Sequence, residues 1–306
     1  MVCALEPTFG GINLEDIKSP ECFYIEQECE RRMGIPVMHD DQHGTAIVAG
    51  AGLINAAELV GKRIEDLQVR VVGCGAAGFT CAKYFVSLGV PKENLIAMDI
   101  DGVVHEGRAD LEADPSLYLH EVASTTEKRT FEEVFDGADV FLGLSAANLL
   151  KPKYLASMNR DPLLFALANP VPEIGFHAAR AVRDDVIMAT GRSDYPNQIN
   201  NVCAFPYIFR GALDCRATNI NEEMKHACTK ALAALAKTKD GWQNDGSQGE
   251  AASCPEFGRD YIIPKPFDKR ILLHVAPAIA EAAMETGVAR RKIDLEEYRN
   301  KLAAES

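Results

Sequence analysis

The sequence lacks the features of several protein classes. No apolar run approaches the ~18 residues of a membrane span, and Glu6 and Pro7 interrupt any early secretory pattern. The nine cysteines are odd in number and form no C-x-x-C, which favours reduced, mostly buried thiols over a disulfide framework. No basic run offsets the formal net charge of -13, and a field of that sign repels phosphate backbones and anionic lipid. We therefore expect a cytoplasmic protein with no nucleic-acid and no membrane partner.

What is present is an average globular composition with an alternating pattern. The chain has 306 residues, of which 47% are apolar and 25% charged, enough for one large α/β domain or two ordinary ones. Short apolar runs alternate with helical patterns along its middle part. The alternation predicts an α/β fold, a doubly wound, mostly parallel Rossmann-type sheet with helices on both faces. The expected strands are 68–73, 94–99, 139–144, 163–168 and 186–190, and the expected intervening helices are 76–88, 130–135, 152–158 and 176–182.

Helical segments flank this alternating region on both sides. A helix rich in Ala and Gly is expected at about 44–59, and its all-round apolar surface predicts a buried packing helix. Two further helices are expected at 221–237 and 269–286, and a short solvated helix at 292–306. The segment 238–255 is rich in Gly, Ser and acidic residues, so we expect an exposed loop.

A glycine motif, Gly73-Cys74-Gly75-Ala76-Ala77-Gly78, directly follows the first expected strand and opens a helix. Glycines let a backbone approach a pyrophosphate, and the helix N-terminus supplies N–H groups and positive dipole. The next strand ends at Asp99, 21 residues beyond Gly78, where an acid can hold a ribose 2′-hydroxyl. We interpret the motif as a dinucleotide site rather than a plain glycine turn, and the acid favours NAD over NADP.

Polar residues stand at the ends of three later strands, where ligands of parallel sheets bind. They are Ser145, the pair Asn169-Pro170, and a long turn from Gly191 to Asn201. Asn amides can donate to a carboxylate and accept from a hydroxyl. For Asn-Pro, ordinary turn chemistry is the alternative interpretation.

A second candidate site is acidic. Glu15-Asp16 follows a glycine-rich segment, and Asp40-Asp41 precedes the small-residue helix. Carboxylate oxygens suit Mg²⁺ or Mn²⁺, but an exposed acidic turn and an N-cap Asp would give the same pattern. The spacing His39-x-x-x-His43 suggests zinc, yet the general-base Glu of zinc proteases is missing.

Several longer strings give the sequence a resemblance to a known family. EPTFGGINLEDI, HDDQHGTA, VVGCGAAG, DVFLGLSAANLL, FALANPVPEI and GRSDYPNQINNV resemble the bacterial-type malic enzymes, and the similarity runs from about Leu5 to Lys301. The resemblance implies oxidative decarboxylation of malate to pyruvate with NAD or NADP and Mg²⁺ or Mn²⁺. It also implies a homo-oligomer, a dimer or larger.

The resemblance assigns roles residue by residue. Glu15, Asp16 and Asp41 match the metal ligands, and Asp40 matches an acid beside the catalytic machinery. Asn169 and Asn200 match amides that contact malate or the nicotinamide end of the cofactor. Gly73, Gly75, Ala76, Ala77, Gly78, Asp99, Ser145 and Asn169 are then the expected cofactor contacts.

The resemblance also suggests three segments and one departure from the family. We expect part of an N-terminal malic-enzyme domain at 1–43, the NAD(P)-binding domain at 44–220 and a helical segment at 221–306. The family's further N-terminal domain, which carries a general-acid tyrosine, a general-base lysine and a substrate-binding arginine, has no match here. The chain alone is therefore expected to be inactive or very weak.

Two other interpretations remain at the level of the sequence. One is a non-catalytic dinucleotide-binding subunit that pairs with a separate N-terminal chain. The other is a different two-domain NAD enzyme, such as an amino-acid dehydrogenase, against which the acidic residues and the Asn-rich turn argue.

Overall fold

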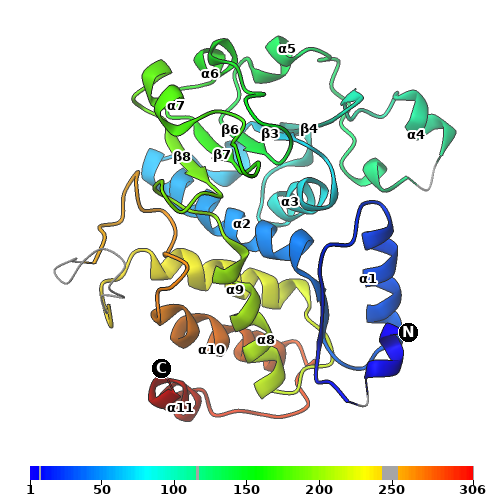
Figure 1. Ribbon diagram of the computed structural model, residues 1–306, viewed down its shortest axis with the longest axis vertical. Helices are drawn as coiled ribbons and strands as arrows, with labels where there is room; N and C mark the ends of the chain where they lie inside the picture. The colour runs from blue at the N-terminus through cyan, green and yellow to red at the C-terminus, as the bar shows by residue number, and fades with distance from the viewer. Residues whose placement is uncertain (7, 115–116, 243–253, 306) are drawn as a thin grey trace. The chain divides into compact units, whose positions relative to one another are not determined.

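The computed structural model describes residues 1–6, 8–114, 117–242 and 254–305 (Figure 1). These residues form two units. The first comprises residues 1–51, 200–257 and 261–306, and the second comprises 52–199 and 258–260. The first unit thus combines the two ends of the chain, whereas the sequence suggested three consecutive segments. That three-segment division stays a prediction.

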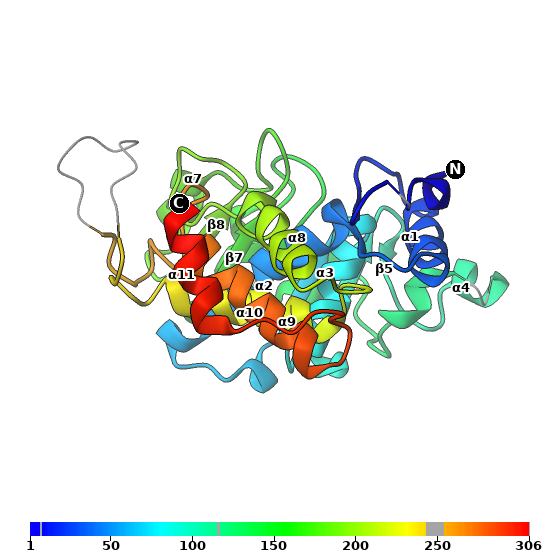
Figure 2. The same ribbon diagram turned by 90° about the horizontal axis from the view of Figure 1, so that it is seen from below.

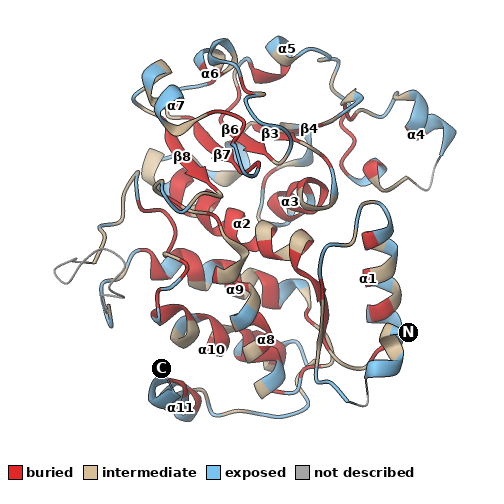
Figure 3. Cartoon of the chain, viewed as in Figure 1, coloured by how far each residue is buried: buried red, intermediate tan, exposed pale blue. Residues whose placement is uncertain are grey.

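The second unit is built on a six-stranded sheet, which confirms the predicted fold class. The strand order is β5-β4-β3-β6-β7-β8, and every pair is parallel except β4 with β5. The strands are β3 (Val69–Val72), β4 (Leu95–Asp99), β5 (Gly102–Val103), β6 (Val140–Gly143), β7 (Leu163–Ala166) and β8 (Ile187–Thr190). All residues of β3, β6, β7 and β8 are buried, as expected for a parallel sheet covered on both faces (Figure 3).

Helices connect these strands, and α3, α5, α6 and α7 lie where the sequence predicts helices, whereas α4 and the 3-10 helices were not predicted. The α-helices are α3 (Ala76–Ser87), α4 (Ala109–Ala113), α5 (Phe131–Phe135), α6 (Pro152–Ser157) and α7 (Phe176–Val182). Short 3-10 helices are η2 (Ile64–Asp66), η3 (Lys92–Asn94) and η4 (Tyr118–Glu121). A core cluster on one face of the sheet includes Phe135, Phe141 and Met188, all fully buried.

The first unit contains a two-stranded parallel sheet and a group of helices. Strands β1 (Ile12–Leu14) and β2 (Val37–His39) pair in register, with Leu14 opposite His39. The helices are η1 (Val2–Leu5), α1 (Glu21–Arg32), η5 (Asn201–Cys203), α8 (Phe205–Asp214), α9 (Glu222–Leu235), α10 (Arg270–Glu285) and α11 (Leu295–Glu305). Helix α2 (Asp40–Val60) starts in this unit, and its last residues belong to the other.

Helix α10 is the centre of the C-terminal helices. It packs against α8, α9 and α11 (Figure 2). The approach to α8 is so close that a Cβ on Gly211 would lie 2.5 Å from the Ala276 carbonyl oxygen. The helices predicted at 221–237, 269–286 and 292–306 therefore all form, whereas α1 and α8 were not predicted.

The segment 238–255, the cysteines and the length of the helices can also be compared with the predictions from sequence. Of the segment 238–255, residues 243–253 lie outside the described residues, and the rest form neither helix nor strand. All nine cysteines are unpaired, and seven are buried, as predicted. None of the helices in the described ranges is both long and apolar enough to cross a membrane.

Candidate functional site

The glycine motif forms the turn between β3 and α3, and its three glycines have different roles. Gly73 has a φ of +99°, and a Cβ there would lie 2.3 Å from the Leu144 carbonyl oxygen. A Cβ on Gly78 would lie 1.9 Å from the Gly73 carbonyl oxygen. Gly75 has an ordinary φ of -79°, and a Cβ there would meet nothing within 4 Å. The fold itself therefore requires Gly73 and Gly78, whereas Gly75 borders open space.

That open space lies at the N-terminus of α3. Gly75 is the N-cap residue of this helix of 12 residues, and no side chain caps it. The backbone N–H groups of the first turn, which includes Ala76 and Ala77, have no acceptor within the helix. Such N–H groups and the helix dipole favour a phosphate. The turn therefore has the local geometry of a pyrophosphate site.

Asp99 is the last residue of β4, as predicted, and it belongs to an ion-pair cluster that was not predicted. Its Oδ1 accepts hydrogen bonds from the Arg108 Nη1 at 2.8 Å and from the backbone N–H of Asp101 at 2.9 Å. Arg108 also forms a bidentate pair with Asp110. The hydrogen bonds and the charge of Arg108 lower the pKa of Asp110 to about 2.

Glu173 connects the ends of β6 and β7 and was missed by the sequence analysis. Its buried carboxylate accepts from the backbone N–H groups of Ser145, at 2.9 Å, and Ala168, at 3.1 Å. Burial raises the pKa of Glu173, and the hydrogen bonds from both N–H groups oppose the shift. A Cβ on Gly143 would lie 2.4 Å from the Glu173 Cδ, so this glycine makes room for the carboxylate. Glu173 thus fixes the backbone beside two predicted cofactor contacts, Ser145 and Asn169.

The two predicted substrate amides belong to different units. In the second unit, Asn169 lies against the end of β8, since a Cβ on Gly191 would be 3.2 Å from its Oδ1. The Asn169-Pro170 peptide bond is cis. In the first unit, Asn200 caps η5, and its Oδ1 accepts from the Val202 N–H at 3.0 Å. The Asn200 amide nitrogen is therefore the donor that could face a ligand.

The two predicted acidic pairs come together in the first unit. Glu15 and Asp16 follow β1, and Asp40 and Asp41 follow β2. Because β1 and β2 are parallel and in register, their carboxyl ends meet at one edge. The Asp16 backbone N–H donates to the Asp41 Oδ2 at 2.8 Å. Four carboxylates that are distant in sequence are thus gathered at one place, which we call the acidic cluster.

Asp40 is the buried member of the acidic cluster, with 6% of its surface exposed. Its Oδ2 accepts from the Asn201 Nδ2 at 3.2 Å, whereas its Oδ1 has no hydrogen-bond partner among the described residues. Gly44, one turn along α2, leaves room for that oxygen. Burial, together with the charges of Glu15 and Asp41, raises the pKa of Asp40 to about 6, although the hydrogen bond from Asn201 opposes the shift.

The donor chemistry of the acidic cluster fits a hard divalent cation. Carboxylates supply the oxygen ligands that Mg²⁺ and Mn²⁺ prefer, and a cation would relieve their mutual repulsion. Within the described ranges, however, no three or more His, Cys, Asp or Glu side chains are arranged as a metal site. The metal role of Glu15, Asp16 and Asp41 therefore stays a prediction.

Glu26 of α1 organises the turn between β2 and α2, and it too was missed. Its buried carboxylate accepts from the His39 N–H at 2.7 Å and from the Gln42 Nε2 at 3.0 Å, and it lies 3.1 Å from the His43 Nε2. Burial raises the pKa of Glu26, but His43 and the charge of Lys225 outweigh it, so the pKa lies below its ordinary value. His39 ends β2 and His43 pairs with Glu26, an arrangement that gives zinc no support.

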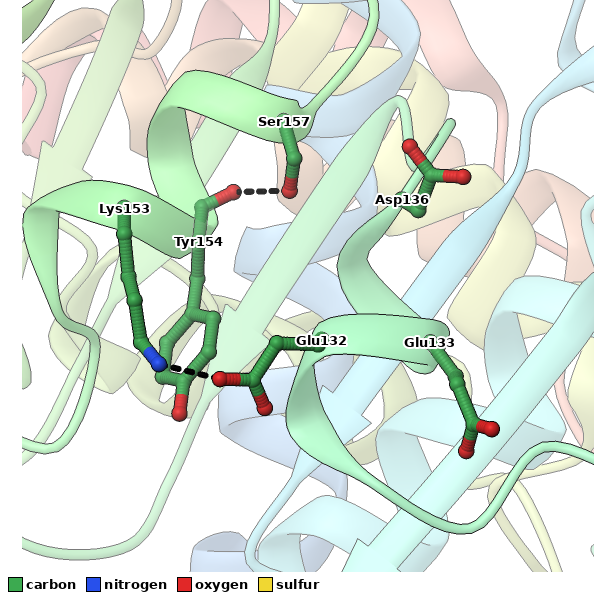
Figure 4. A pocket seen from close by; sticks show the side chains of 6 residues that line it. All are labelled: Glu132, Glu133, Asp136, Lys153, Tyr154 and Ser157. Atoms are coloured by element: carbon green, nitrogen blue, oxygen red, sulfur yellow. Dashed lines mark hydrogen bonds and ion pairs between the residues drawn. The ribbon is translucent and has the colours of Figure 1, made fainter.

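Two surface hollows contain none of the predicted site residues. One of about 400 Å³ lies between α5 and α6, where an ion pair joins Lys153 and Glu132 (Figure 4). Its lining residues are Glu132, Glu133, Asp136, Lys153, Tyr154 and Ser157. The other, of about 290 Å³, lies beside α11. Neither is associated with the glycine turn or the acidic cluster.

The order of the parallel strands, the glycine turn after β3 and the acid Asp99 at the end of β4 together define a dinucleotide-binding domain of the Rossmann type. Residues 42–245, more than half of the chain, match the family model "Malic enzyme, NAD binding domain". The chain belongs to the malic enzyme family.

Related proteins and structures are similar over nearly the whole chain. The NAD-dependent malic enzyme of Rhizobium meliloti is 50% identical over 99% of this chain, and the NADP-dependent malic enzyme of Salmonella typhimurium is 50% identical over the same share. The chain spans 39% of the length of each. The crystal structure of malic enzyme from Pyrococcus horikoshii matches with a TM-score of 0.87 and 38% identity, covering 99% of this chain and 67% of that one.

Replacing Asp40 by Asn should change how stability depends on pH. The Asp40 pKa is about 6 in the folded chain against an ordinary value of 3.8, so its contribution favours folding at low pH and is lost as the pH rises through 6. From about pH 4 to pH 7, Asp40→Asn should therefore gain on the order of 2 kcal/mol of unfolding free energy relative to the native chain. Urea unfolding at several pH values measures this. A constant difference between the two proteins would contradict the environment assigned to Asp40.

Replacing Glu173 by Gln should destabilise the second unit. The amide has one acceptor oxygen, so its NH₂ group would face the N–H of either Ser145 or Ala168. A buried donor left unpaired costs about 1–3 kcal/mol. Thermal and urea unfolding would measure the loss, with Glu127→Gln, at an exposed carboxylate, as the matched control. Equal stability of the two variants would show that Glu173 does not hold the strand ends.

Proposed function

We propose that the chain binds NAD or NADP at the turn from Gly73 to Gly78. The observation that carries this proposal is the asymmetry of the glycines. Gly73 and Gly78 are required by backbone contacts, but Gly75 has neither strain nor a neighbour that explains the missing side chain. A pyrophosphate seated on the uncapped N-terminus of α3 explains it. Ser145 and Asn169 at the later strand ends would then contact the nicotinamide end.

We further propose that the acidic cluster serves malate oxidation and decarboxylation. Glu15, Asp16 and Asp41 are the ligands we assign to Mg²⁺ or Mn²⁺. When bound, the cation would act as a Lewis acid toward the substrate oxygens, and the nicotinamide would accept the hydride. Asp40, with its unpaired Oδ1 and raised pKa, is suited to hold a proton close to these ligands. In the same unit as the acidic cluster, the amide of Asn200 can bind a carboxylate or hydroxyl group of malate. For Asn169, in the second unit, contact with malate or the nicotinamide stays a prediction.

We propose that this chain carries only part of the activity of its longer relatives. The chain spans 39% of the length of the first relatives it matches, and the acid, base and arginine implied by the family resemblance match no motif in it. We infer that the chain supplies the cofactor site and the acidic cluster, and that proton transfer needs residues beyond these 306. A cytoplasmic homo-oligomer, dimer or larger, is part of the same proposal. The second candidate is a dinucleotide-binding subunit without catalysis.

Gly75→Val should weaken dinucleotide binding without preventing folding. The valine side chain would occupy the space assigned to the pyrophosphate, while the backbone at Gly75 is accessible to any residue. We expect the Kd for NADH, measured by fluorescence titration, to rise at least tenfold. Gly175→Val is a matched control, because Gly175 is also a helix N-cap residue with nothing within 4 Å of an added Cβ. Equal NADH affinity in all three proteins would refute the site.

The purified chain should show little malic enzyme activity alone. A missing general acid or base each lowers a rate by about 10²–10⁴-fold, and two such losses with a missing arginine leave turnover near background. The assay is NADH or NADPH formation from malate with Mn²⁺, with and without a separately expressed N-terminal malic-enzyme domain. Added domain should restore turnover, and Asp41→Asn should abolish the gain.

Two results of this assay would redirect the proposal. Full activity of the chain alone would mean that its own Tyr or Lys residues carry the proton transfers. No activity with the added domain, despite normal NADH binding, would favour the non-catalytic subunit.

A further inference from the structure

An Arg held between two carboxylates stands where β4 ends. Arg108 donates from Nη1 to the Asp99 Oδ1 at 2.8 Å, and from Nε and Nη2 to the two carboxylate oxygens of Asp110 at 2.6 Å each. The Arg108 side chain is 11% exposed and that of Asp99 15%, whereas Asp110, on the short helix α4, is 43% exposed. We call these three residues the 99–108–110 cluster.

The cluster lies beside the glycine turn. Strand β4 is the direct neighbour of β3, whose end carries the turn. The segment after β5 also returns to the turn, because the Tyr118 hydroxyl donates to the Cys74 carbonyl oxygen at 3.2 Å. The Tyr118 ring packs edge-on against Phe79 of α3, with 4.9 Å between ring centroids. In this fold the adenosine ribose of a dinucleotide lies between the glycine turn and the acid at the end of the second strand.

The charges of the cluster discriminate between a 2′-hydroxyl and a 2′-phosphate. Two carboxylates and one guanidinium leave a net charge of -1. A ribose hydroxyl can donate to Asp99, but a phosphate carries about -1.5 to -2 charges and only acceptor oxygens. Arg108 is the cation that could bind such a phosphate, yet three of its donor groups are directed to Asp99 and Asp110. Relatives at the same 50% identity are named NAD-dependent and NADP-dependent, so similarity alone does not decide the preference.

We propose that Asp110 determines the cofactor preference of this chain by withholding Arg108 from the 2′-phosphate, and that NAD is the preferred dinucleotide. This inference rests on the proposed dinucleotide site. Asp110 acts through Arg108 and needs no contact with the cofactor. Without the Asp110 carboxylate, the planar fork of Arg108 is available for bidentate binding of a phosphate. Asp99 continues to serve the 2′-hydroxyl of NAD.

The test compares the Kd values of NADH and NADPH at one fixed ionic strength. In the native chain NADH should bind more tightly. Asp110→Ala should tighten NADPH binding by about tenfold, the effect of one charge-assisted hydrogen-bond pair, and leave NADH binding within about twofold. Asp110→Asn, which keeps the size of the side chain, should shift the ratio in the same direction and guards against a folding defect in the alanine variant.

Two further proteins separate the role of Arg108 from that of net charge. Glu112→Ala removes an exposed carboxylate from the same helix, α4, and should leave the NADH/NADPH ratio nearly unchanged. Arg108→Gln combined with Asp110→Ala should lose the gain in NADPH affinity.

Three results would overturn the inference. The first is an unchanged ratio in both Asp110 variants, and the second is an equal gain in Glu112→Ala or in the Arg108→Gln double variant. The third is a native chain that already prefers NADPH. If the native chain binds neither dinucleotide, the proposed function fails together with this inference, whereas NADH binding with an unchanged ratio refutes the inference alone.

Discussion

Parallel pairing of β3 with β4 and β6 is the constraint on which the nucleotide site depends. Because the strands run in the same direction, their carboxyl ends meet at one edge, and the glycine turn, Asp99 and Ser145 are brought together there. The ends of β3 and β6 lie so close together that a Cβ on Gly73 would be 2.3 Å from the Leu144 carbonyl oxygen. The same rule acts on a smaller scale in the first unit, where the parallel pair β1 and β2 gathers the acidic cluster.

The net charge of -13 repels an anionic cofactor, so its binding site must supply local attraction. The glycine turn presents the backbone N–H groups and the positive dipole end of α3. These groups carry no net charge, and water can hydrate them when no ligand is bound. The nearby guanidinium of Arg108 is already compensated by two carboxylates. Binding of the pyrophosphate is therefore expected to depend on oriented dipoles rather than on net positive charge.

Local patterns made the second unit predictable from sequence. Buried strands such as 163–166 and 187–190 are short apolar runs, and the glycine motif has a fixed spacing between strand and helix. Helix α1 was missed because its sequence, ECFYIEQECERR, is mostly polar and lacks a clear apolar stripe. Strands β1 and β2 have three residues each, too few to show a period. The acidic pairs were found as local strings, but only the pairing of these two strands shows that they meet.

Buried carboxylates show why the rest of the site could not be read from the sequence. Glu26 and Glu173 bind N–H groups 13 and 28 residues away, so nothing in their sequence neighbourhoods marks them. In both residues each carboxylate oxygen accepts a hydrogen bond. Glu26 thereby fixes the turn between β2 and α2, and Glu173 fixes the ends of β6 and β7. Asp40 differs, because one buried oxygen has no donor among the described residues and its pKa is raised to about 6. Asp40 thus leaves a buried acceptor without a donor at the acidic cluster, where a proton, a cation or a substrate group would offset the cost of about 1–3 kcal/mol that an unpaired buried oxygen carries.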